Sequence, residues 1–174
     1  MDIYHKITSK NAPNINPDIE KGFLKYHNHA DIRKTHLFEG RYENIYLNEQ
    51  HIPALRTLIN EATALAENIL NVSNLRAGFW FNYMPPGSIT TLHTHDDDDE
   101  LLSCVYYVNV PENSGNLILY DGEDYSGQKK IEIQSRTGDF IFFKPDVRHE
   151  VTKNNSPEHR LSIGFNFGLN ELPG

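Results

Sequence analysis

The sequence predicts a mainly β protein, a sandwich, barrel or jelly roll with N-terminal helices packed outside it. Two observations indicate this class. One helical stripe of apolar residues precedes residue 75, and after it the period of the apolar residues changes from 3.6 to 2. Eight short segments with a period of 2 then alternate with turn-forming residues, as in sandwiches and barrels. The length of 174 residues fits a single domain over 1–174, with a helical or irregular support over 1–75 and a β-sandwich core over 76–170.

The first fifty residues have the weakest pattern. Residues 11–14 and the pair Asn16-Pro17 favour turns, and 18–27 fits a short helix. A clear helix is predicted over 53–71, with Pro53 suited to its first turn. Its apolar stripe consists of Leu55, Leu58, Ile59, Ala62, Leu65, Ala66 and Ile69. We expect this stripe to pack on a sheet.

The eight strands follow, separated by turns rich in Pro, Gly, Asn and Asp. They are predicted over residues 76–83, 89–95, 101–109, 116–120, 129–134, 139–143, 149–152 and 160–167. Phe79 and Trp80, in the first of them, are expected in the core.

The last strand has two different faces. Leu161, Ile163, Phe165 and Phe167 form an apolar face, and Arg160, Ser162, Gly164 and Asn166 form the other. On an open sheet the second face would be solvated. In a closed sandwich it would line a cavity, where an Arg beside a hydroxyl suits a carboxylate ligand.

Composition excludes several classes of protein. The chain has 24 acidic and 16 basic residues, a net charge of −8, which disfavours nucleic acid or an anionic membrane as a partner. No segment approaches the ~20 apolar residues of a membrane span, and the first ten residues lack the apolar core of a secretory signal. The single cysteine excludes a disulfide framework and a CxxC zinc site within one chain. These features predict a cytoplasmic protein.

Histidines in the strand region form a candidate metal site. Side chains two residues apart on a strand share a face, so His93 and His95 can bind one ion. Imidazole suits iron, zinc, copper or nickel. His149 opens a later strand, after a turn, an apolar strand and a Pro-containing bend. Asp97 continues the parity of His93 and His95, so a carboxylate would join the same face if the strand persists.

The series His93-x-His95, His149 and Arg160-x-Ser162 resembles the Fe(II)/2-oxoglutarate-dependent dioxygenase superfamily. Within it, the prolyl-hydroxylase-like members and the small oxygenases of bacteria and their viruses are most similar. The resemblance covers residues 79–168. It implies a double-stranded β-helix and an enzyme with Fe(II) as cofactor and 2-oxoglutarate as cosubstrate. Such an enzyme couples decarboxylation of 2-oxoglutarate to succinate with oxidation, usually hydroxylation, of a small-molecule or peptide substrate.

The resemblance also implies roles for individual residues. His93 and His149 take the two histidine ligand positions. Arg160, helped by Ser162, would hold the distal carboxylate of 2-oxoglutarate. Tyr83 and Tyr107 correspond to positions where relatives place hydroxyls near this cosubstrate. The neighbouring Tyr106 points to the face opposite Tyr107.

The third metal ligand departs from the family pattern, which is normally His-x-Asp or His-x-Glu. One alternative is a three-histidine site of His93, His95 and His149. The other is that the acidic loop supplies Asp97 after a local bulge. Spacing favours His95.

The departure leaves a second class of protein open. Gly87-x5-His93-x-His95-x4-Glu100 fits the first motif of the cupins, which bind metal through three His and a Glu. The second cupin motif is matched only in part, because the interval from Gly138 to Pro145 is one residue too long and Val147 replaces a glycine. The alternative function is therefore a cupin-type metalloprotein that uses a three-His site without 2-oxoglutarate. A metal-free binding module is a third alternative.

Overall fold

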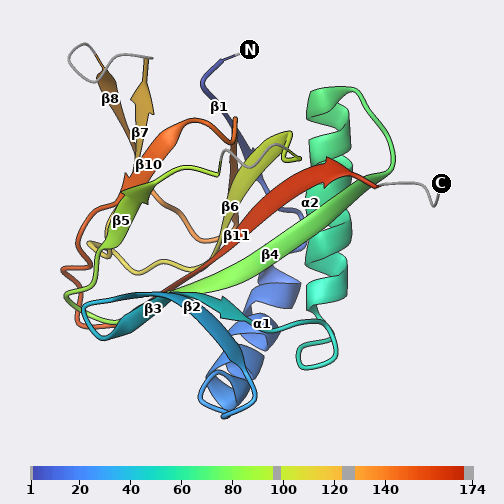
Figure 1. Cartoon of the computed structure of the whole chain (residues 1–174). Coiled ribbons are helices and arrows are strands. Elements are labelled where there is room, and N and C mark those ends of the chain that lie inside the picture. Colours follow the sequence, from blue (N-terminus) through green and yellow to red (C-terminus); the bar gives the residue numbers. More distant parts are fainter. Residues whose placement is uncertain (1, 96–98, 123–127, 171–174) are drawn as a thin grey trace.

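The computed structural model describes residues 2–95, 99–122 and 128–170. These residues form two antiparallel sheets that face each other, and two helices cover the outer side of the larger sheet (Figure 1). The larger sheet has the strand order β1-β9-β6-β11-β4-β3-β2, and the smaller one has the order β5-β10-β7-β8. The predicted fold class, mainly β with N-terminal helices outside the sandwich, is confirmed.

The elements have the following bounds: β1 (Tyr4–Thr8), α1 (Ala12–Tyr26), β2 (Arg33–Phe38), β3 (Arg41–Tyr46), α2 (Leu55–Leu70), β4 (Leu75–Met84), β5 (Thr90–His93), β6 (Leu102–Asn109), β7 (Leu117–Asp121), β8 (Lys129–Ile133), β9 (Asp139–Phe143), β10 (Arg148–Val151) and β11 (Arg160–Leu169). No helix among the described residues is long and apolar enough to cross a membrane.

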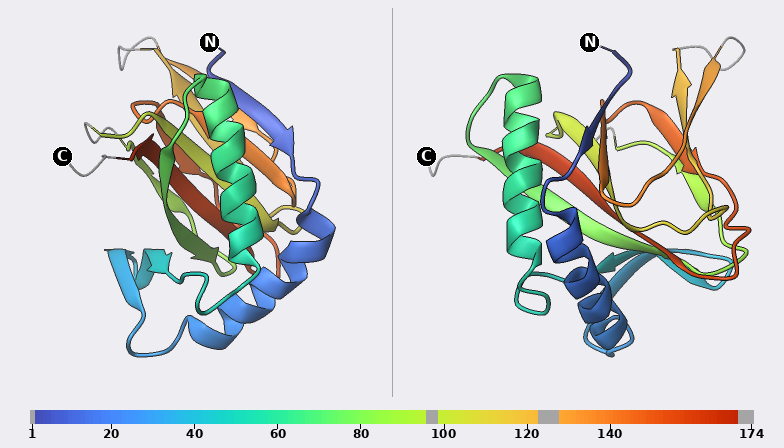
Figure 2. Two further views of the ribbon diagram at one scale, coloured as in Figure 1. Left: turned by 90° about the vertical axis from the view of Figure 1, so that its right-hand side faces the viewer. Right: turned by 180° about the vertical axis from the view of Figure 1, so that it is seen from behind.

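The main core lies between the helices and the larger sheet (Figure 2). Leu55, Leu58, Ala62 and Ala66 of α2 are buried there, which confirms most of the predicted stripe. They pack in one cluster with the apolar face of β11, formed by Leu161, Ile163, Phe165 and Phe167. Each large apolar side chain buried in this way stabilises the fold by about 1.5–3 kcal/mol. A second, smaller core fills the space between the two sheets.

The N-terminal helix begins earlier than expected. Helix α1 starts at Ala12, so the prediction of turns over 11–17 was wrong. A proline is tolerated in the first helical turn, where its missing N–H has no partner to lose. Pro17 lies one turn further on. Because it has no N–H, it cannot donate one of the backbone hydrogen bonds of the helix. Buried Asn16 instead accepts a hydrogen bond of 2.5 Å from the Tyr106 hydroxyl, which fixes α1 on β6.

Three strands of the larger sheet, β1, β2 and β3, lie in the region where helical or irregular structure was expected. The hairpin of β2 and β3 turns at Glu39 and Gly40, whose φ angles of 49° and 76° are typical of a two-residue hairpin turn. Side chains in these strands are mostly polar and partly exposed, so they lack the apolar alternation that identifies a strand.

Strand β11 occupies the middle of the larger sheet. It pairs with β4 over its full length and with β6 on its other side. Its apolar face packs under the helices, and Ser162 and Gly164 line a cavity between the two sheets. Of the two alternatives for the polar face of this strand, the structure therefore has the enclosed one.

Candidate metal centre

Three histidines from two segments meet at one end of the space between the sheets. His93 of β5 and His149 of β10 are direct cross-strand partners, and their ring centroids lie 4.1 Å apart. Strand β5 ends at His93, two residues before the end of the predicted strand, so His95 lies just after it. The His95 N–H donates to Pro145 O at 2.8 Å. One ring nitrogen from each histidine lies within 4.8 Å of the other two. This spacing lets the three imidazoles bind a single metal ion.

Backbone carbonyls orient two of these rings. His93 Nδ1 lies 2.6 Å from Thr91 O, and His149 Nδ1 lies 2.9 Å from Val147 O. A carbonyl only accepts, so each Nδ1 carries the proton. Nε2 is then the nitrogen of each ring that is available to a metal ion, because the hydrogen bond of one ring nitrogen selects the other as the ligand.

Burial keeps His149 in the form that binds metal. The residue is 3% exposed. This burial, together with the neighbouring His93 and His95, holds the pKa of His149 well below the ordinary 6.5. The ring is therefore neutral at physiological pH. The His149 ring forms an edge-to-face contact with the buried ring of Phe143, with centroids 4.7 Å apart.

The sequence offers two carboxylates as possible metal ligands, Asp97 and Glu100. Asp97 lies outside the described residues. Glu100, the fourth ligand of the cupin pattern, forms an ion pair of 3.3 Å with Arg76 and is not part of the histidine cluster. Among the described residues, the cluster consists of the three histidines.

Arg160 lies on the inner face of β11 and is fully buried, at 0% exposure. Its Nη2 donates to Ser135 Oγ at 2.8 Å, Nη1 lies 3.7 Å from Met84 Sδ, and the guanidinium sits 5.2 Å from the centroid of the Tyr107 ring. Its Nε has no partner, and no carboxylate pairs with it within the described part of the chain. Burial lowers the pKa of Arg160, and Tyr107 opposes that effect.

Two further predicted residues share this interior. Tyr107 of β6 is fully buried, and its hydroxyl lies beside Ser135 and Arg160 without a well-aligned hydrogen bond to either of them. Burial raises the pKa of Tyr107, and the neighbouring Arg160 lowers it in part. Ser162 is buried and lines the cavity with the histidines. The unpartnered Arg160 Nε and the neighbouring Tyr107 hydroxyl thus lie in one region, and both can donate to an anionic ligand.

The structure does not bring Tyr83 together with these residues. Adjacent residues on a strand face opposite sides of the sheet, so Met84 lies beside Arg160 and Tyr83 faces outward. The Tyr83 ring packs against Phe23, His27 and His159, with centroid distances of 5.3–5.4 Å.

The cavity beside the histidines has a volume of about 40 Å³. Several of its lining residues were missed from the sequence: Glu43, Asn44, Trp80, Asn82 and Thr90. Trp80 was expected in the core, but its indole lies 5.1 Å from the His95 ring, centroid to centroid. It fits because Gly164 has no side chain; a Cβ there would lie 2.5 Å from the indole. A glycine inside a strand is a signal of such a close approach.

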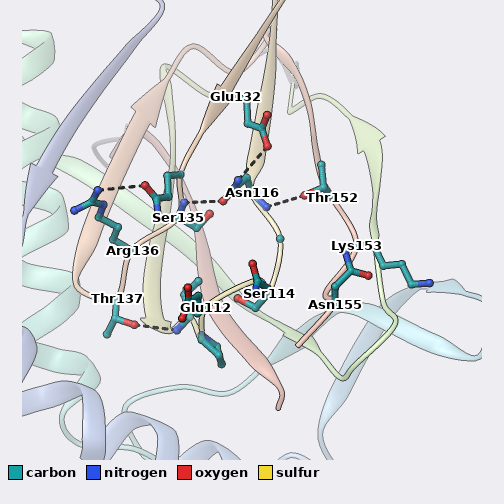
Figure 3. A pocket seen from close by; sticks show the side chains of 15 residues that line it. Glu112, Ser114, Asn116, Glu132, Ser135, Arg136, Thr137, Thr152, Lys153 and Asn155 are labelled. Carbon is teal, nitrogen blue, oxygen red and sulfur yellow. Dashed lines mark hydrogen bonds between the residues drawn. The ribbon is translucent and has the colours of Figure 1, made fainter. Parts of the chain in front are cut away.

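A second, more open hollow lies elsewhere and has a volume of about 1070 Å³. It is a trough at the ends of β7 and β8, lined mainly by polar side chains, several of which bond to one another (Figure 3). Asn116, for example, bonds to Glu132 and to the backbone N–H of Ser135. None of the three histidines lines this trough. Ser135 lines the trough and also accepts the hydrogen bond from Arg160. The trough therefore reaches the guanidinium of Arg160 and not the histidine cluster.

Comparison with known proteins agrees with this site. Residues 78–166, slightly more than half of the chain, match the family model described as "Putative 2OG-Fe(II) oxygenase". No curated protein sequence matches the chain. The fold and the histidine cluster define a metal-binding enzyme with the double-stranded β-helix of oxygenases. The chain belongs to the 2OG-Fe(II) oxygenase family, whose cofactors are Fe(II) and 2-oxoglutarate.

Solved structures share the fold at low sequence identity. The epimerase SnoN from nogalamycin biosynthesis has a TM-score of 0.77 and 16% identity, and the match covers 97% of this chain and 78% of that one. A prolyl-4-hydroxylase from Pseudomonas putida has a TM-score of 0.71 and 16% identity, with 95% and 92% covered. A prolyl hydroxylase from Trichoplax adhaerens, in complex with a peptide of hypoxia inducible factor, has a TM-score of 0.72 and 16% identity, with 97% and 84% covered.

Proposed function

We propose that this enzyme binds Fe(II) through His93, His95 and His149 and holds 2-oxoglutarate with Arg160, to oxidise a small-molecule or peptide substrate. The observation that carries the proposal is the buried Arg160 without a carboxylate partner. A buried cation is strongly destabilising unless an anion and hydrogen bonds compensate it. The interior is therefore suited to an anionic ligand that enters from outside the chain.

The residues around the guanidinium fit a carboxylate. An Arg fork can bind both oxygens of a carboxylate, and Arg160 still has a free Nε–H. The Tyr107 hydroxyl offers a further donor. Ser162 shares the inner face with Arg160 and lines the cavity that reaches the histidines. Met84, whose flexible thioether lies against Nη1, is the side chain that must yield when the ligand enters.

Charge balance supports the same assignment. Three neutral imidazoles leave the full +2 charge on a bound metal ion, and Arg160 adds another positive charge. A dicarboxylate such as 2-oxoglutarate places one negative charge at each end of this arrangement and so offsets most of its positive charge. When bound, Fe(II) and 2-oxoglutarate supply the oxidising chemistry, in which oxygen converts 2-oxoglutarate to succinate and carbon dioxide and a substrate C–H bond is hydroxylated. The chain contributes ligand geometry, orientation of the cosubstrate and exclusion of water.

The test is a turnover measurement without substrate. Protein purified anaerobically and loaded with Fe(II) is titrated with 2-oxoglutarate, and succinate is measured after oxygen is admitted. We expect saturable binding of 2-oxoglutarate and slow succinate formation. A cupin-type protein would bind metal without this turnover. Iron-loaded protein that neither binds 2-oxoglutarate nor forms succinate would overturn the proposal.

A further inference from the structure

A buried carboxylate lies in the same cavity as the histidines. Glu43 of β3 is 7% exposed and lines the cavity together with His93, His95 and Trp80. Thr91 Oγ1 donates to Glu43 Oε1 at 2.8 Å, which joins the β2–β3 hairpin to β5. Figure 2 shows the hairpin extending from the larger sheet past the end of the sandwich. Glu43 is not among the ligand atoms that cluster within 4.8 Å, so the observed geometry does not make it a metal ligand.

No cation compensates this carboxylate within the described part of the chain. Arg41 is near enough for the two charges to interact, but no ion pair forms between them. The Arg41 guanidinium donates instead to Asn82 Oδ1 at 2.9 Å, to Tyr83 O at 2.8 Å and to Ile89 O at 2.6 Å. Thr91 is the single hydrogen-bond partner that the described residues give Glu43. The cavity thus holds a carboxylate with one oxygen uncommitted.

We propose that Glu43 and Trp80 form a subsite for a cationic group of the substrate, an alkylammonium or a guanidinium, beside the histidine cluster. This inference rests on the proposed oxygenase function and names the class of its substrate. The Glu43 carboxylate is mostly shielded from water and forms no ion pair within the described residues, so a cation from the substrate would compensate its charge. The face of an indole attracts cations, and Trp80 lines the same small cavity. The net charge of −8 also attracts a cationic substrate from solution.

The experiment uses the anaerobic protein loaded with Fe(II) and 2-oxoglutarate. The probes are n-butylammonium and n-butylguanidinium, with the neutral 1-pentanol as the comparison. Binding is followed by calorimetry and by the fluorescence of Trp80, the one tryptophan in the sequence. We expect a saturable change with both cations and none with the alcohol at the same concentration. Equal binding of the alcohol and the cations would overturn the inference.

Two variants separate charge from structure. Glu43→Gln keeps an acceptor for Thr91 but removes the charge, whereas Thr91→Val removes the hydrogen bond but keeps the charge. We expect Glu43→Gln to weaken binding of the cations at least ~10-fold and Thr91→Val to change it by less than ~3-fold. The control Glu158→Gln, at an exposed position away from the cavity, should bind as the native protein does. The reverse ranking of the first two variants would show that Glu43 only anchors the hairpin.

Two further readouts complete the test. Metal affinity of Glu43→Gln is measured by Co(II) absorption; loss of metal with unchanged cation binding would assign the carboxylate to the metal and overturn the inference. Succinate formation by the native protein is measured separately. If succinate forms and the cations do not bind, the subsite is refuted and the oxygenase function stands. If the cations bind but the iron-loaded protein neither binds 2-oxoglutarate nor forms succinate, the oxygenase function is refuted and the subsite stands.

Discussion

Arg160 is the residue whose replacement tests the cosubstrate pocket most directly. A guanidinium paired with a carboxylate in a dry site contributes ~1.5–3 kcal/mol. Arg160→Ala should therefore weaken 2-oxoglutarate binding ~10- to 100-fold and leave iron binding nearly intact. Arg160→Lys should recover only part of the affinity, because an ammonium cannot form the fork. The exposed Arg136, at the rim of the polar trough, provides a control, Arg136→Ala, with native affinity. Unchanged binding in Arg160→Ala would place this residue outside the pocket.

The third ligand can be identified by two alanine variants. The His95 ring reaches the cluster of His93 and His149, so His95→Ala should lose most iron binding and all succinate formation. Asp97→Ala should keep both within a few-fold, because His93 and His95 share a strand face by spacing alone and the residue types of 96–99 have poor strand propensity. Iron content after dialysis and succinate formation are the measurements. The opposite ranking would restore a His-x-Asp site with His95 as its first histidine.

The buried His149 should make stability depend on pH. Burial and the neighbouring histidines hold its pKa in the folded protein well below 6.5, the value expected in the unfolded chain. Below pH 6.5 the unfolded chain takes up a proton that the folded protein does not, so the free energy of unfolding falls as the pH falls. Above pH 6.5 this contribution is fully present. His27 has a lowered pKa for the same main reason, burial, and acts in the same direction.

Urea unfolding of the metal-free protein at pH 7.5 and pH 5.5 measures this effect. The native protein should lose stability between the two values, and His149→Gln should lose less. The comparison isolates His149, because His27 is present in both proteins. Identical losses would show that His149 is not held neutral by its surroundings.

Among the secondary-structure elements, helix α2 offers a clean test of the main core. Leu58 is fully buried between α2 and the larger sheet. Leu58→Ala should lower the free energy of unfolding by about 2–5 kcal/mol, because it removes apolar contacts and leaves a cavity. Arg56, on the same helix, has a side chain that is 69% exposed and pairs with Glu49. Arg56→Ala should cost less than ~1 kcal/mol. Equal costs in denaturant unfolding would contradict the packing described.

Secondary structure was predictable where one face of an element is buried. Strands such as β8 and β11 alternate apolar and polar residues, whereas β9 is a continuous apolar run after Asp139. Each observed strand after residue 75 overlaps the predicted one within a few residues. The β2–β3 hairpin lacks this alternation because its side chains are mainly polar and partly exposed. Its one sequence signal is Gly40 in the turn. The hairpin was therefore missed, and Glu43 with it, since a residue outside any predicted strand cannot be placed beside a distant site.

The candidate site was predictable to the extent that it depends on parity, that is, on the alternation of side chains between the two faces of a strand. Parity along β11 placed Arg160 and Ser162 on one face, and parity along β6 separated Tyr107 from Tyr106. The polar face of β11 is enclosed because the smaller sheet lies over it. The periodicity of the sequence does not show where that second sheet lies. The position of Trp80 depends on Gly164, a contact between two strands that are eighty residues apart.

For the whole molecule, metal should stabilise the smaller sheet most. The histidines join β5, a four-residue edge strand, to β10, and the register between these two strands is irregular. A ligand present at 100 times its dissociation constant raises the free energy of unfolding by about 2.7 kcal/mol. Addition of Fe(II) should raise the melting temperature, and a chelator should reverse it. Hydrogen exchange should quicken at β5 on metal removal and stay unchanged in α2. Uniform changes in exchange would contradict this local effect.

The position of β11 has a consequence for how the chain is made. This strand lies between β4 and β6, yet its residues 160–169 leave the ribosome after those of every other described strand. Without β11, the strand groups β2–β3–β4 and β1–β9–β6 have no pairing with each other, and β4 and β6 each lack their neighbour in the sheet. The three histidines also precede Arg160 in the chain, so the metal ligands are synthesised before both the central strand and the guanidinium that suits an anion. Pairing of β11 with β4 and β6 then completes the sheet and places Arg160 in the interior in the same step.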